Sequence, residues 1–428
     1  MKMMKLLKIV NIGFLWCPLL LFALQNTTSN YKQFEGEVID TDTGKPLIFA
    51  TLTVENSNIS TITNTEGDFI LKVPQELLEN NLVVSFLGYT TKRVALNDLT
   101  TIKNRITLKA SIVELTEVDV NAPKNARVLV ERVFFNKGDN YFNSPTVMTA
   151  FYRETIKKRR KNVSLSEAVV NVYKTPYYSN RRDALQLYKA RKSTDYDKLD
   201  TIALKLQGGP YNTLYTDLVK YPDIVFIDQN FDDYNFRFDR STTVNNNLVY
   251  VIAFEQKESI SEPLYKGELF INVENQTLTS AVYELNITDR EMAARLFVRR
   301  KPAKVDVWPT KVAYRVDYRN KNGKWYYGYS NVYLEFKVDW ADKLFNSVYS
   351  MTAEMAITDW NPNTTNELPK NKERIRTSII LADEASGFSD PEFWGEYNII
   401  EPEKSIESAI KKIQRQLRRA ERKSAAKP

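Results

Sequence analysis

Two groups of acidic residues are the places where this sequence could carry acid–base chemistry. The first group is Asp195, Asp197 and Asp200, and the second is Asp228, Asp232 and Asp233. A pair of carboxylates can hydrolyse a glycosidic bond when one acts as an acid and the other as a nucleophile or base. The chain contains 53 acidic residues, however, and acidic residues are common in solvated turns. We therefore expect both groups to lie in surface loops, and we assign no catalytic residue.

The chain lacks the residue types on which many enzymes and metal sites depend. It has no histidine, and its single cysteine, Cys17, lies in a segment that we expect to be removed. These absences exclude a Ser-His-Asp hydrolase, a histidine-ligated zinc peptidase and a cysteine nucleophile. The sequence also has no G-x-S-x-G motif, no phosphate-binding glycine loop and no calcium loop. It predicts a non-enzymatic protein with no cofactor-binding and no metal-ligating residues.

A group of aromatic residues has the composition of a ligand-binding surface. Trp325, Tyr326, Tyr327 and Tyr329 lie close together in a sequence that contains 24 tyrosines. Such side chains can stack on sugars, but they are also favoured in β-strands for packing reasons alone. Carbohydrate binding therefore stays open as one interpretation beside ordinary strand packing.

The amino terminus has the pattern of a secretory signal. Lys2, Lys5 and Lys8 precede an almost wholly apolar run from Ile9 to Leu24, and polar residues begin at Gln25. A run of this length falls short of the roughly 20 residues that span a bilayer. We predict that residues 1–25 are a cleaved signal peptide and that the protein is exported.

Residues 31–110 have the pattern of a β-sandwich. In the stretch 50–54 the apolar residues alternate with threonines, and Phe69, Leu71 and Val73 alternate in the same way. This two-residue period is typical of strands with one buried face. Gly44 and Gly67 lie in the turn segments between such strands, where glycine readily adopts positive φ angles.

The same stretch resembles a known family. The matching residues are Gly36, Val38, Asp40, Thr43, Gly44, Pro46, Leu47, Ala50, Gly67, Phe69, Gly88 and Tyr89. Their order is similar to that of the carboxypeptidase regulatory-like domain, a seven-stranded, transthyretin-like sandwich. The resemblance implies a non-catalytic spacer or docking module of the kind found in secreted Gram-negative surface proteins, including TonB-dependent receptors. It implies a location in the periplasm or at the outer membrane, with another envelope protein or the inner surface of that membrane as partner.

The rest of the chain divides into a connection and a larger β domain. Residues 111–145 predict a linker strand at 115–120 and an amphipathic helix between Pro123 and Gly138. Residues 146–400 predict an antiparallel domain of long strands, each with one apolar and one wet face. Within it, the polar segment 177–221 reads mainly as loop with a short helix. The fold class is therefore mainly β: a sandwich followed by a curved open sheet or half-barrel with a few helices.

Residues 401–428 predict a basic amphipathic helix and tail. Residues 404–428 contain nine basic and two acidic residues, so their net charge is +7. This equals the formal net charge of the whole chain. Ile406, Ile410, Ile413 and Leu417 form a narrow apolar seam. Such a helix can dock on its own domain, lie on anionic lipid or pair with a partner helix. We expect docking, and we expect no nucleic-acid partner for an exported protein.

Together these patterns predict a structural or binding protein. The main alternative is a carrier of a lipid or another apolar ligand within the curved sheet, and carbohydrate binding is the third. An open apolar cavity of several hundred Å³ in the larger β domain would favour the carrier.

Overall fold

A computed structural model describes residues 30–111, 125–159, 161–194, 206–244, 246–299, 301–385 and 393–401 of the chain. Within residues 30–111, seven strands form two small sheets with the strand orders β4-β1-β7 and β3-β2-β5-β6. The strands are β1 Tyr31–Asp40, β2 Thr51–Val54, β3 Ser60–Ile62, β4 Asp68–Pro74, β5 Asn81–Ser85, β6 Lys92–Ala95 and β7 Asn104–Leu108. Strand β1 runs antiparallel to β4 and parallel to β7. The predicted sandwich is confirmed.

The sandwich core follows the alternation in the sequence. Leu52, Val54, Phe69, Leu71 and Val73 are all buried, as expected. Gly67 has a φ of 84°, and a Cβ atom there would lie 2.8 Å from the carbonyl oxygen of Val38. This turn therefore requires glycine for two reasons, its backbone conformation and the close approach of the neighbouring chain.

The connection to the larger domain contains the predicted helix. Helix α1 spans Ala126–Phe135 and buries five apolar residues, namely Ala126, Leu129, Val130, Val133 and Phe134. The Asn125 side chain accepts hydrogen bonds from the first backbone N–H groups, which sets the start of the helix. Gly138 does not end α1, because it lies within the separate short helix α2, Lys137–Asn140. The predicted strand at 115–120 and Pro123 lie outside the described residues.

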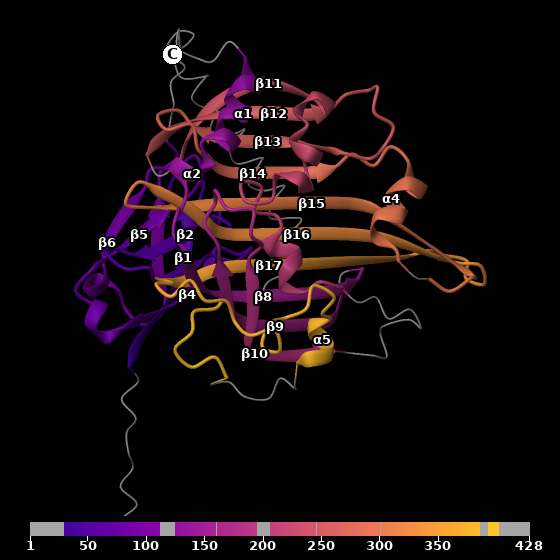
Figure 1. The fold of residues 1–428 in the computed structure, drawn as a ribbon. Coiled ribbons are helices and arrows are strands. Elements are labelled where there is room, and N and C mark those ends of the chain that lie inside the picture. The colour runs from indigo at the N-terminus through magenta and orange to yellow at the C-terminus, as the bar shows by residue number, and fades with distance from the viewer. Residues whose placement is uncertain are drawn as a thin grey trace, which may run out of the picture.

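Ten antiparallel strands form the large sheet (Figure 1). Their order is β10-β9-β8-β17-β16-β15-β14-β13-β12-β11. The strands are β8 Thr146–Lys158, β9 Lys161–Lys174, β10 Ala184–Thr194, β11 Tyr234–Val244, β12 Asn247–Gln256, β13 Tyr265–Asn272, β14 Leu278–Leu285, β15 Val305–Lys321, β16 Lys324–Trp340 and β17 Ser347–Pro362. The order ends at β10 and β11, so the sheet is open, and the expected antiparallel sheet is confirmed. In the described ranges, no helix has the length and apolar character needed to cross a bilayer.

Short helices lie between and after these strands. They are α3 Pro210–Leu214, η3 Pro222–Ile224, η4 Ile227–Gln229, η5 Phe231–Asp233, α4 Arg290–Phe297 and α5 Leu381–Glu384. The segment 177–221 therefore contains a complete strand, β10, in addition to loop and a short helix. The prediction that it is mainly loop was wrong at that strand.

The expectation of one wet face is wrong for the middle of the large sheet, since side chains on both faces are buried there. In β12, Tyr250 and Ile252 belong to the core shared with α1 and α3, whereas Val249 and Val251 belong to the core shared with the sandwich. The sandwich contact is direct, because the rings of Phe49 and Tyr329 lie 5.1 Å apart. Charged residues on this face, such as Arg153, Glu167 and Glu354, are buried and paired with one another.

Residues 393–401 join the sandwich to the large sheet. The Asn398 side chain accepts a hydrogen bond from the backbone N–H of Lys72 at 2.7 Å and donates one to the Lys72 carbonyl at 3.1 Å. On the sheet, the guanidinium of Arg191 lies 4.8 Å from the ring centre of Trp394. Arg153 donates to the backbone carbonyl of Glu401 at 3.0 Å. The segment thus contacts β4 on one side and β8 and β10 on the other.

A row of alternating charges on the sheet holds this segment. Glu354, Arg153, Glu167 and Arg191 lie side by side on β17, β8, β9 and β10. Arg153 pairs with Glu354 at 3.2 Å and with Glu167 at 2.6 Å, and Glu167 also pairs with Arg191 at 2.8 Å. Neighbouring strands therefore place opposite charges against each other beneath residues 393–401.

Candidate functional site

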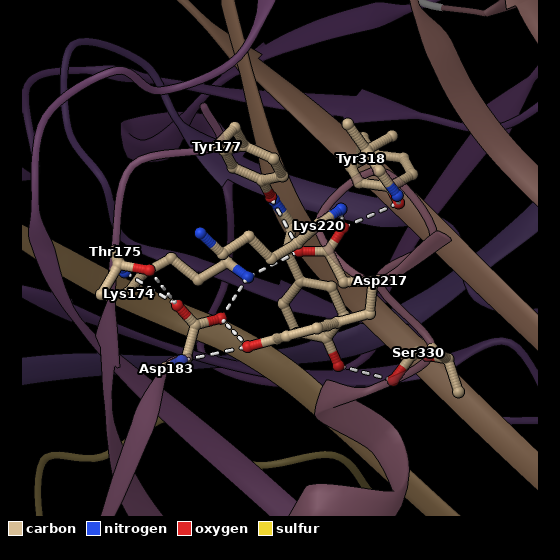
Figure 2. A network of polar contacts seen from close by, with 12 residues as sticks. Lys174, Thr175, Tyr177, Asp183, Asp217, Lys220, Tyr318 and Ser330 are labelled. Carbon is tan, nitrogen blue, oxygen red and sulfur yellow. Dashed lines mark hydrogen bonds and ion pairs between the residues drawn. The ribbon is translucent and has the colours of Figure 1, made fainter. Parts of the chain in front are cut away.

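A buried ionic cluster lies where β9, β10 and α3 meet. Its centre is Lys174, the last residue of β9, whose Nζ atom lies 2.6 Å from carboxylate oxygens of both Asp183 and Asp217. Asp183 immediately precedes β10, and Asp217 follows α3. Figure 2 shows the ammonium between the two carboxylates. The side chain of Lys174 is 1% exposed and those of the two aspartates are 0% exposed, so this is a fully desolvated group of charges.

Hydroxyl and amide donors satisfy the remaining carboxylate oxygens. Asp217 accepts from Tyr177 at 3.0 Å and from Tyr318 at 2.9 Å. Asp183 accepts from the Tyr221 hydroxyl at 2.7 Å and from the backbone N–H of Thr175 at 2.8 Å. Buried charges require this kind of complete hydrogen bonding to be stable. The cluster therefore has the character of a rigid structural unit.

The pKa values in the cluster follow from burial and charge. Burial disfavours the charged form of Lys174, but Asp183 and Asp217 outweigh it and raise the pKa of this ammonium. Burial raises the pKa of Tyr177 and of Tyr318 well above the usual value, and Asp217 adds to this effect. Lys174 thus stays protonated and the tyrosines stay neutral. Neither Lys174 nor these two tyrosines is therefore poised to exchange a proton near neutral pH.

A solvent-accessible cavity adjoins the cluster. Its volume is about 340 Å³, and its lining includes Lys137, Arg182, Tyr215, Lys220, Tyr221 and Asp223. Tyr221 belongs to both, because its hydroxyl binds Asp183 while its side chain lines the cavity. The rings of Tyr215 and Tyr221 lie 5.0 Å apart in an edge-to-face arrangement. The ionic cluster therefore fixes one wall of the cavity.

Positive charge dominates this cavity. Lys137, Arg182 and Lys220 contribute three cations, and Asp223 contributes one carboxylate to the lining. Lys220 Nζ donates to the carbonyl oxygens of Pro176 at 2.7 Å and of Ser179 at 2.6 Å. Burial lowers the pKa of Lys220 to about 8, and it also lowers the pKa of Lys137. An anion in the cavity would supply the counter-charge that favours the protonated lysines.

The acidic groups singled out in the sequence do not form a carboxylate pair in a cleft. Asp232 is exposed and pairs with Arg127 of α1. Asp228 is exposed in η4 with a φ of 52°. Asp233 ends η5, which is followed directly by β11. Asp195, Asp197 and Asp200 lie outside the described residues. Among the described residues, no group of three or more His, Cys, Asp or Glu side chains comes together to hold a metal ion.

The aromatic residues considered for sugar stacking are buried. Trp325, Tyr326, Tyr327 and Tyr329 are each at most 4% exposed. Tyr327, for example, points at Ser330 and Thr213 within the core. Strand packing therefore explains these four residues. The cluster of Lys174, Asp183 and Asp217 was not predicted from the sequence, in which the one local signal was the charge of Asp217 close to Leu214, Leu218 and Val219.

Taken together, the fold and the site define a two-part β protein with a cationic cavity on its larger part. Comparison with known families identifies the amino-terminal part, since residues 34–120 match the CarboxypepD_reg-like domain. This part of the chain is therefore a carboxypeptidase regulatory-like domain, as its sequence predicted. No curated protein matches the chain.

Three solved structures show distant likenesses. A DUF1329 family protein from Desulfovibrio piger is 10% identical, with 56% of this chain and 92% of that chain covered and a TM-score of 0.23. A 9R-lipoxygenase from Cyanothece is 11% identical, with 40% and 43% covered and a TM-score of 0.16. Lipovitellin is 6% identical, with 54% and 27% covered and a TM-score of 0.23. TM-scores this low support no inference about this chain.

Proposed function

We propose that this chain is an exported, non-enzymatic binding protein of the cell envelope whose ligand is a small anion held in the cavity beside the ionic cluster. The observation that carries the proposal is the lining of that cavity, with Lys137, Arg182 and Lys220 set against the single carboxylate of Asp223. A volume of about 340 Å³ lies in the range of small-molecule sites. The non-enzymatic assignment rests on the sequence, which lacks histidine.

Packing in the larger domain favours this ligand class over a lipid. The face of the sheet opposite the sandwich carries a group of aromatic rings around Phe226. The ring centre of Phe226 lies 4.8 Å from Phe231, 5.3 Å from Tyr234 and 5.8 Å from Phe254. A lipid bound against this face would have to displace these side chains, whereas the cationic cavity is already open.

Location and partners belong to the same proposal. The signal-like residues 1–25 and the regulatory-like domain support a place in the periplasm or at the outer membrane. The exposed parts of the sandwich are available to another envelope protein. Amino-terminal sequencing of the mature protein should give a first residue between about Leu24 and Ser29, and an intact Met1 would contradict export with cleavage.

Titration calorimetry with inorganic phosphate, citrate and galacturonate tests the ligand class. We expect at least one of these anions to bind the parent protein, and the double variant Lys220→Met with Arg182→Gln to bind it at least about tenfold more weakly. Binding should also weaken between pH 7 and pH 9, because Lys220 loses its proton through a pKa of about 8.

Lys45→Gln provides the matched control, since Lys45 is an exposed cation in a turn of the sandwich. This variant should bind the anion as the parent does. Equal affinities for the parent and the cavity variant would rule out the cavity as the binding site. Native mass spectrometry of the protein as purified would show whether an anion is already bound.

A further inference from the structure

The turn between β16 and β17 carries two large apolar side chains that face water. Leu344 is 95% exposed and Phe345 is 79% exposed. Figure 1 shows this hairpin projecting at the end of the long strands away from the sandwich. Exposed apolar residues are common singly, but two adjacent ones at the apex of a projecting turn form a wedge with no described side chain packed over it.

Basic residues lie next to this turn. The described residues of the segment 295–304, which runs from the end of α4 to the start of β15, include four basic and no acidic residues. It reaches the turn directly, because the backbone N–H of Ala341 donates to the carbonyl oxygen of Lys304 at 3.1 Å. Lys343 adds a further cation, whose Nζ atom lies 4.7 Å from the ring centre of Trp340. The apolar wedge and the cations therefore belong to one end of the molecule.

The acidic residues of this region only partly cancel that charge. Asp306 is paired with Lys301 at 2.8 Å. Asp339 and Asp342 lie on the hairpin itself. The α4 side also presents Leu296, which is 58% exposed, beside the cation of Arg295. The surface thus combines exposed apolar side chains with a net positive charge.

We propose that the β16–β17 turn, with the segment 295–304, docks on the surface of an anionic phospholipid bilayer. Leu344 and Phe345 enter the boundary between headgroups and acyl chains, and the flanking lysines and arginines contact the phosphates. Peripheral proteins bind membranes through this combination of apolar insertion and electrostatic attraction. The chemistry favours lipid over a protein partner, because a two-residue wedge offers far less area than the roughly 800 Å² per partner of a stable protein interface.

Co-sedimentation of the full mature chain with vesicles tests this docking. Vesicles of phosphatidylglycerol and phosphatidylcholine should bind the parent protein, and binding should weaken as salt rises from about 0.05 M to about 0.5 M. The double variant Leu344→Ala with Phe345→Ala should bind at least about tenfold more weakly, because it loses most of its insertable apolar surface. Arg299→Gln with Lys304→Gln should reduce both the binding and its salt dependence.

The control is Phe135→Ala, which removes an apolar side chain of α1 that is 89% exposed elsewhere on the molecule. This variant should bind vesicles as the parent does. Vesicle binding that survives both changes at the turn would assign the membrane contact to the basic residues 404–428 and would overturn the proposal. A parent that is dimeric in solution and becomes monomeric on loss of Leu344 and Phe345 would overturn it in favour of self-association.

Discussion

Lys174 carries one positive charge between two carboxylates, and all three side chains are buried. The mutual attraction and the tyrosine donors compensate the cost of removing these charges from water. Such a group gives little net stability compared with an apolar core. Removing one member, however, strongly destabilises the folded state, because the remaining charge stays buried without its partner. Its physical role in this molecule is to fix the ends of β9, β10 and the segment after α3 beside the cavity.

We predict that Lys174→Met destabilises the protein by about 3–5 kcal/mol, because it leaves two carboxylates buried without their cation. Urea unfolding followed by circular dichroism measures the loss. Lys266→Met is the comparison, since Lys266 pairs with Glu284 at 3.8 Å on the surface. That variant should lose less than about 1 kcal/mol. Similar losses of stability for the two variants would show that the buried ion pairs of Lys174 matter no more than an exposed ion pair.

The buried carboxyl of Glu154 should make the stability of the protein depend on pH. Burial raises the pKa of this carboxyl from 4.5 to about 7, against the stabilising hydrogen bond from Tyr152, and the charge of Asp383 adds to the rise. Between pH 4.5 and about pH 7, Glu154 is therefore protonated in the folded state and ionised in the unfolded state. Stability from this group is complete below about pH 4.5 and falls as the pH rises towards 7, by on the order of 3 kcal/mol.

Glu154→Gln should remove this contribution, because the amide cannot ionise. Comparing the free energies of unfolding of the parent and the variant at pH 5 and pH 8 isolates the effect. The parent should lose more stability than the variant between these two values. A parent and variant with the same difference between pH 5 and pH 8 would show that Glu154 does not titrate in this range.

Residues with a strong local pattern could be placed from the sequence, and residues that depend on distant partners could not. The burial of Phe69 and Leu71 follows from the two-residue period alone. The burial of Lys72, which directly follows Leu71, does not, since it arises from contact with Asn398, which lies more than 300 residues away in the sequence. The contact of Lys174 with Asp183 and Asp217 could not be predicted either, because the three residues lie in different parts of the fold: at the end of β9, before β10 and after α3.

At the scale of elements, residues 393–401 have more influence than their short length suggests. They contain no regular strand, yet Asn398 hydrogen-bonds the backbone of β4 as a neighbouring strand would. Trp394 packs against Phe151 of β8 with ring centres 5.4 Å apart. The segment therefore joins the edge of the sandwich to the face of the large sheet.

We predict that Asn398→Ala costs about 1–3 kcal/mol, because it removes both hydrogen bonds that the Asn398 amide makes with the buried backbone of Lys72. Hydrogen exchange of the Lys72 amide should become faster in the same variant. Asn97→Ala is a control that removes an exposed hydrogen bond to Glu79 and should change stability by less than about 0.5 kcal/mol. Unchanged exchange at Lys72 would contradict the assigned role of Asn398.

The elements themselves were predicted unevenly. Helix α1 and the long strands have clear periods, and they were found. Strand β10 was missed because its sequence, Ala184–Thr194, is rich in lysine, arginine and polar residues and lies at an edge of the sheet. The wet face assigned to the strands was wrong because the sandwich and residues 393–401 cover that face, where arginine and glutamate pair with each other. A single sequence shows the alternation but not what covers each face.

At the scale of the whole molecule, the sandwich and the large sheet share a core. Phe34, Leu52, Phe69 and Val84 form the part of it that lies within the sandwich, and Phe151, Val251, Tyr329 and Trp394 contribute from outside. The regulatory-like domain is therefore packed against its neighbour through apolar side chains. The sequence predicted its fold but not this attachment, because no local pattern marks which surface of a sandwich will be covered.

We predict that the excised segment 30–111 still unfolds in one cooperative step but melts at a lower temperature than it does within the full chain, since Phe49 and its neighbours lose their packing. Phe69→Ala should cost about 3–5 kcal/mol in either setting, because this ring is buried within the sandwich itself. Calorimetry of the segment, the full chain and both variants measures these effects. Identical melting temperatures for the segment and the full chain would show that the shared core adds no stability.

The strand order of the large sheet has a consequence for how the chain reaches its native state. Strands β11 to β16 can pair in sequence as they are synthesised, and β8 to β10 can do the same. The two groups meet only through the pairing of β8 with β17, and residues 159–346 lie between these strands. Closing so long a loop is slow, so both partial sheets keep an unpaired edge until residues 347–362 are present. A nascent chain that stalls before β17 therefore exposes the edges of β8 and β16 to pairing with other chains. When β17 pairs with both strands, it covers these edges and so protects the chain from aggregation.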